Sequence, residues 1–77
     1  MKKLEKKFNK VFSTFDKFMQ QVVISLFDGR EAVISFEGGD YEFCDNAMLI
    51  HGKKEVYEYV CNLIKSDKVS SIVVDCL

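Results

Sequence analysis

Residues 22–36 read VVISLFDGREAVISF. Two runs rich in β-branched residues flank Asp28-Gly29, a dipeptide typical of tight hairpin turns. A three-residue loop, residues 27–29 with Gly29 in the left-handed conformation, places the apolar residues of both runs on one face. Those residues are Val22, Ile24, Leu26, Ala32, Ile34 and Phe36. The pattern predicts an antiparallel hairpin with one buried face.

Two further turns follow the hairpin. Gly38-Gly39-Asp40 marks one turn and Asp45-Asn46 the next, with short strand-like runs at residues 41–44 and 47–50. We therefore expect residues 21–52 to form a β-rich body built as a four-stranded meander.

Amphipathic helical patterns lie on both sides of this body. From Leu4 onward, apolar residues recur at helical spacing while lysines fill the opposite face, which predicts a helix over about residues 3–20. Ser13 followed by Asp16 could alternatively act as a weak internal cap that splits this helix. Residues 53–66 predict a second helix, and residues 69–75 predict a last strand.

Together the patterns predict one α+β domain over residues 1–77. Its elements are an N-terminal amphipathic helix, an antiparallel four-stranded meander, a second helix and a C-terminal strand in a single sheet, with both helices on one sheet face. The length of 77 residues allows one hydrophobic core and no second one.

Composition and charge narrow the class of protein. The chain is 48% hydrophobic and 30% charged, as in ordinary globular proteins. The first 20 residues contain six lysines and two acidic residues, whereas the remainder is acidic, so generic nucleic-acid binding by the body is disfavoured. The apolar runs are too short to span a bilayer, and no continuous apolar run follows the initial Met-Lys-Lys-Leu. We expect a cytoplasmic protein with no membrane association.

Catalytic and metal-binding residues are not indicated by any motif. His51 and the three cysteines match the residue types of a zinc site, but gaps of 7, 10 and 15 residues do not form ligand pairs. We expect Cys44, Cys61 and Cys76 to be buried free thiols, and we expect no enzyme activity, metal or cofactor.

Interaction with a macromolecule is the predicted function: a small regulatory protein that binds a protein partner or itself, and we expect a homo-oligomer. Tyr41 and Phe43 alternate with Glu42, and Tyr57 lies off the apolar stripe of its helix. These aromatics predict an exposed patch, or alternatively they complete the core. A cluster of acidic residues could also imitate nucleic-acid charge towards a basic partner. The acidic residues concerned are Asp40, Glu42, Asp45, Glu55 and Glu58.

The segment from Val22 to Glu31, with Gly38, Asp40 and Asn46-x-x-Leu49, resembles the first motif of the Sm, LSm and Hfq family. The run KVSSIV at 68–73 is similar to that family's closing strand, so about 55 residues are covered. The resemblance implies an RNA-binding ring in which Asp40 and Asn46 match the loop at the RNA site. Nucleic acid is an expected partner only under this Sm-like alternative. The chain departs from the family at Ile34, where a glycine is expected, and at residues 53–65, which read as a helix.

Overall fold

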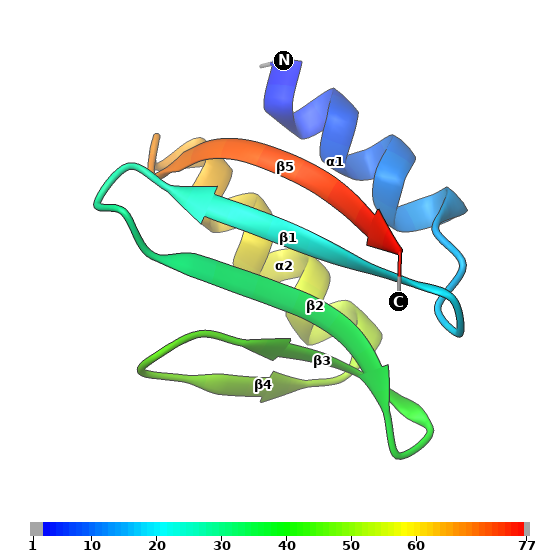
Figure 1. Cartoon of the computed structure of the whole chain (residues 1–77). Helices are drawn as coiled ribbons and strands as arrows, with labels where there is room; N and C mark the ends of the chain where they lie inside the picture. Colours follow the sequence, from blue (N-terminus) through cyan, green and yellow to red (C-terminus); the bar gives the residue numbers. More distant parts are fainter. Residues whose placement is uncertain (1–2, 77) are drawn as a thin grey trace.

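A computed structural model describes residues 3–76 and contains one five-stranded antiparallel sheet with two helices (Figure 1). In chain order the elements are α1 (Lys3–Thr14), β1 (Gln20–Leu26), β2 (Glu31–Glu37), β3 (Asp40–Cys44), β4 (Leu49–His51), α2 (Lys53–Lys65) and β5 (Val69–Cys76). The strand order across the sheet is β4-β3-β2-β1-β5, and both helices lie on the same side of the sheet. The predicted α+β architecture is confirmed.

The register of the first hairpin matches the prediction. Val22 lies opposite Ile34 and Ile24 opposite Ala32, which leaves residues 27–29 as a three-residue loop. The Leu26 amide donates to the Arg30 carbonyl at 2.9 Å and closes this loop. Gly29 has φ 91°, a value that an L side chain rarely adopts. The apolar alternation therefore fixes both the loop length and the buried face.

Helix α1 ends at Thr14, so the predicted extension to residue 20 is wrong. The Ser13 and Thr14 hydroxyls both donate to the Lys10 carbonyl, at 3.0 and 2.7 Å. The Asp16 carboxylate then accepts the Phe18 amide at 3.0 Å, and the Asp16 carbonyl accepts the Gln20 amide at 2.8 Å. Such local bonds replace the helical pattern, and they turn the chain into β1.

The core lies between the two helices and the helix-facing side of the sheet. Helix α1 buries Phe8 and Phe12 there, and α2 buries residues at its own helical spacing. The remaining core residues are Val22, Ile24, Leu26, Ala32, Ile34, Phe43, Val56, Val60, Ile64, Val69 and Ile72. Within residues 3–76 the buried side chains are all hydrophobic, so burial of apolar surface is the main stabilising contribution.

Candidate protein-binding surface

Phe43 is fully buried, so its prediction as a partner-binding residue is wrong. In β3 it lies opposite Ile34 of β2 and Ile50 of β4, on the face that the helices cover. Its ring centroid is 5.2 Å from that of Tyr59 in α2. The alternation along β3 places Phe43 inward and Glu42 on the opposite face, because successive side chains of a strand point to opposite sides.

Tyr41 and Tyr57 are half-buried, and both contact α1. The Tyr57 ring stacks on Phe8 at a centroid distance of 5.6 Å, and its hydroxyl donates to the Asn9 side chain. Contact with the Cys61 thiol, together with burial, raises the pKa of the Tyr57 hydroxyl. Tyr41 packs against Phe12 at 5.4 Å. These tyrosines attach α1 to the rest of the domain instead of forming a free aromatic patch.

Asp40 and Asn46, the two positions implied by the Sm-like resemblance, lie at opposite ends of β3. The strand itself, from Asp40 to Cys44, already spans about 13 Å between them. Asp40 follows the β2–β3 turn, whereas Asn46 lies in the β3–β4 loop. The structure therefore does not bring these two side chains together.

A hollow of about 360 Å³ lies at the opposite end of the sheet from Asp40, where three connections meet. These are the β1–β2 loop, the β3–β4 loop and the α2–β5 connection. The wall is formed by Leu26, Phe27, Asp28, Arg30, Asp45, Ala47, Met48, Tyr59, Leu63, Asp67 and Lys68. Of the candidate binding residues named from the sequence, only Asp45 lines this hollow.

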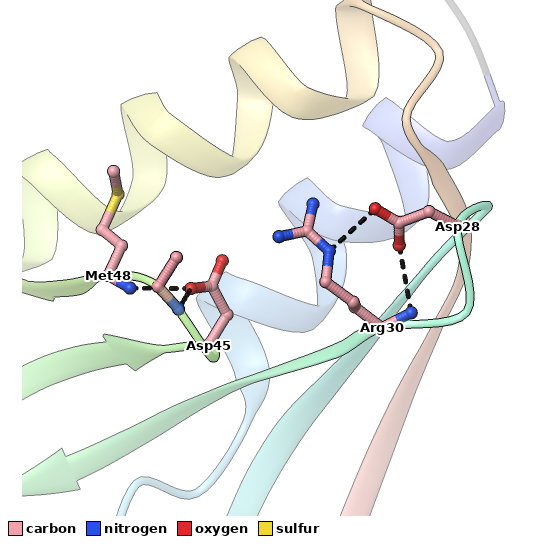
Figure 2. A network of polar contacts seen from close by, with 5 residues as sticks. Asp28, Arg30, Asp45 and Met48 are labelled. Carbon is pink, nitrogen blue, oxygen red and sulfur yellow. Dashed lines mark hydrogen bonds and ion pairs between the residues drawn. The ribbon is translucent and has the colours of Figure 1, made fainter.

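Two hydrogen-bonded turns hold the rim of the hollow in place (Figure 2). The Asp28 carboxylate accepts the Arg30 amide at 3.0 Å and the Arg30 Nε at 2.7 Å. The hydrogen bond from the Arg30 amide lowers the pKa of Asp28, and the hydrogen bond and positive charge of the Arg30 guanidinium lower it further. On the other side, Asp45 Oδ1 accepts the amides of Ala47 and Met48 at 2.8 and 2.9 Å. Both loops are thereby ordered locally.

Large apolar side chains are exposed beside this hollow. Phe27 is 72% exposed and Met48 is 42% exposed. Arg30 reaches from the β1–β2 turn towards the space between the loops and α2 (Figure 2). Phenylalanine, methionine, tyrosine and arginine are the residue types enriched at protein–protein interfaces. Sequence reasoning missed Phe27, although an aromatic residue inside a predicted turn was a signal for exposure. We name Phe27, Arg30, Asp45 and Met48 with the hollow the loop-end surface.

The cysteines are free thiols, but the prediction that they are buried is wrong. Cys44 and Cys76 are exposed, and Cys61 is half-buried. Among the residues that the structure describes, no three His, Cys, Asp or Glu side chains lie together as a metal site. Neither of the two described helices is long and apolar enough to cross a membrane.

No protein-family model matches this chain, and no curated protein or solved structure matches it.

Proposed function

We propose that this chain is a small non-catalytic protein that acts by binding a protein partner through the loop-end surface. The observation that carries the proposal is the pair of exposed apolar side chains, Phe27 and Met48, beside a hollow of about 360 Å³. A large apolar side chain that stays in water in the free protein gains free energy when a partner covers it.

The free energy that Phe27 can contribute to binding is large for a single side chain. A phenylalanine buries roughly 150–250 Å² when it is fully covered, and apolar burial contributes about 25 cal/mol per Å². With 72% of its area exposed, Phe27 alone offers about 3 kcal/mol, which corresponds to more than 100-fold in affinity. The hydrogen bonds of Asp28 and Asp45 order both loops before binding, so the entropic cost of association is reduced.

The proposal is tested by comparing capture of partners from the source organism by tagged wild-type protein and by a Phe27→Ser, Met48→Ser variant. We expect the wild type to capture a protein whose recovered amount falls at least tenfold with the variant. The matched control is Lys54→Ser, an exposed change on α2. Equal capture by all three proteins contradicts the proposal.

The alternative function is an Sm-like ring that binds RNA, and one feature favours it. The two helices carry seven lysines and three glutamates, so the helix side of the molecule could attract phosphates. The solution mass, measured by light scattering on a sizing column, distinguishes the proposals. Six or seven chains per particle favour the ring, whereas a monomer or dimer removes it.

A further inference from the structure

The sheet has a second surface of unusual composition, the side that carries neither helix (Figure 1). We name it the open face. Burial alternates along β1, where Val22, Ile24 and Leu26 are buried and the residues between them are only half-buried. The alternate residues of every strand therefore point to the open face, away from the core.

An apolar row crosses the whole open face. Successive register pairs join Val73 to Val23, Val23 to Val33, Val33 to Cys44, and Cys44 to Leu49. Each of the five strands thus contributes one apolar side chain to the same row. Val73 and Leu49, at its two ends, are 52% and 54% exposed. The row has the hydrophobic character of a binding surface and lies in a sheet whose hydrogen bonds hold it rigid.

The Asp and Glu side chains of the strands all lie on the open face, and no lysine or arginine of the strands balances them. The five strands contain five carboxylates and neither lysine nor arginine. The carboxylates are those of Glu31, Glu37, Asp40, Glu42 and Asp75. Each is separated by an even number of residues from the apolar-row residue of its own strand, so strand alternation places all five on the open face. His51 Nδ1 lies 3.8 Å from Glu42 Oε2 on the same face.

We infer that the open face binds a basic amphipathic helix of another protein. This inference goes beyond the loop-end surface, because it concerns a different side of the sheet and states the chemistry of the partner. Four inter-strand spacings make the apolar row about 19 Å long. A helix rises about 1.5 Å per residue, so roughly 13 residues cover the row. Lysines on both flanks of such a helix would face Glu31 on one side of the row and Glu42 and Asp75 on the other.

A second copy of this chain fits the open face less well. Two open faces in contact would oppose carboxylates to carboxylates, which is unfavourable. The chain's own basic amphipathic helix, α1, already buries Phe8 and Phe12 in its core and packs Leu4 and Val11 against that core. Charge complementarity therefore selects a basic partner over self-association.

The test uses a fluorescent 14-residue helical peptide of leucine and lysine, LKKLLKLLKKLLKL, with LEELLELLEELLEL as its charge-reversed control. We expect the lysine peptide to bind the full chain at least tenfold more tightly than the glutamate peptide, measured by anisotropy at physiological salt. Val73→Asp places a carboxylate in the apolar row, where the apolar side of the bound peptide would cover it. Because removing that carboxylate from water costs more than its attraction to the flanking lysines returns, we expect this variant to weaken binding at least fivefold. Circular dichroism checks that this variant is folded.

Two control variants locate the binding. Ser13→Asp adds the same charge on the exposed side of α1, and Phe27→Asp adds it to the loop-end surface. We expect both variants to bind the lysine peptide with an affinity within twofold of that of the wild type. In each of them, peptide binding should change the amide chemical shifts of Val23, Val33 and Val73. Equal binding of both peptides, loss of binding only in Phe27→Asp, or a wild-type dimer that Val73→Asp dissociates would each overturn the inference. Loss only in Phe27→Asp would leave the loop-end proposal standing, so the two failures are distinguishable.

Discussion

Replacing Phe43 by alanine tests whether this residue belongs to the core or to a binding surface. Its side chain is fully buried between Ile34, Ile50 and the ring of Tyr59. Truncation of a buried phenylalanine costs about 3–5 kcal/mol, because apolar contacts are lost and a cavity remains. A 77-residue domain has a total stability of roughly 4–12 kcal/mol. Phe43→Ala is therefore expected to remove much of the stability.

A milder change and an exposed control make this measurement quantitative. Phe43→Leu conserves most of the volume and should cost about 1–1.5 kcal/mol. Phe27→Ala, at a 72% exposed position, should change the free energy of unfolding by less than about 0.5 kcal/mol. The assay is urea unfolding followed by far-ultraviolet circular dichroism, with equal slopes required for comparison. If Phe43→Ala and Phe27→Ala had the same midpoint, the assignment of Phe43 to the core would be refuted.

Three further predictions concern the loops of the loop-end surface. Gly29→Ala should destabilise the protein by about 1–2 kcal/mol in urea unfolding, because the φ of Gly29 is 91°. No atom lies near enough to clash with an added Cβ, so this cost comes from the backbone conformation alone. Gly29→Asn should cost less, and equal values for the two variants would contradict this explanation. Asp28 has a lowered pKa in the folded protein, so its contribution to stability is fully present above the ordinary value of 3.8 and is lost as the pH falls from there through the lower folded-state pKa. The stability advantage of wild type over Asp28→Asn should therefore shrink as the pH falls below about 4, and a constant difference would argue against this contribution. Asp45→Ala removes the acceptor for two amides and should cost about 1 kcal/mol while shifting the NMR signals of Met48; unchanged signals would show that the loop is held by other contacts.

The body of the fold could be predicted from local patterns in the sequence. Asp28-Gly29 and the apolar alternation around it determine the hairpin register, because a shift by one residue would turn Ile24 and Ile34 towards solvent. The second helix and last strand followed from equally regular patterns. The end of α1 could not be predicted, because helical apolar spacing continues past Thr14 while side-chain hydrogen bonds at Ser13 and Asp16 stop the helix.

The candidate site was less accessible to sequence reasoning. Tyr41, Phe43 and Tyr57 look like surface aromatics as long as the positions of the helices are unknown. Packing against α2 removes Phe43 from solvent, and ring contacts with α1 leave the two tyrosines half-buried. The loop-end surface joins Phe27, Met48 and Leu63, which are far apart in sequence. Its residues come together only through the strand order and the return of the chain from α2 to β5.

Site-specific photo-crosslinking shows directly whether the loop-end surface contacts a partner protein. A benzophenone amino acid is placed at Phe27, within the loop-end surface, and in a second protein at Asn62, an exposed position on α2. Both proteins are produced in the source organism and irradiated there. We expect a discrete crosslinked species of higher mass from position 27 that is absent from position 62 and is lost when Met48 is also changed to serine. The same products from both positions, or none from position 27, would contradict partner binding through the loop-end surface.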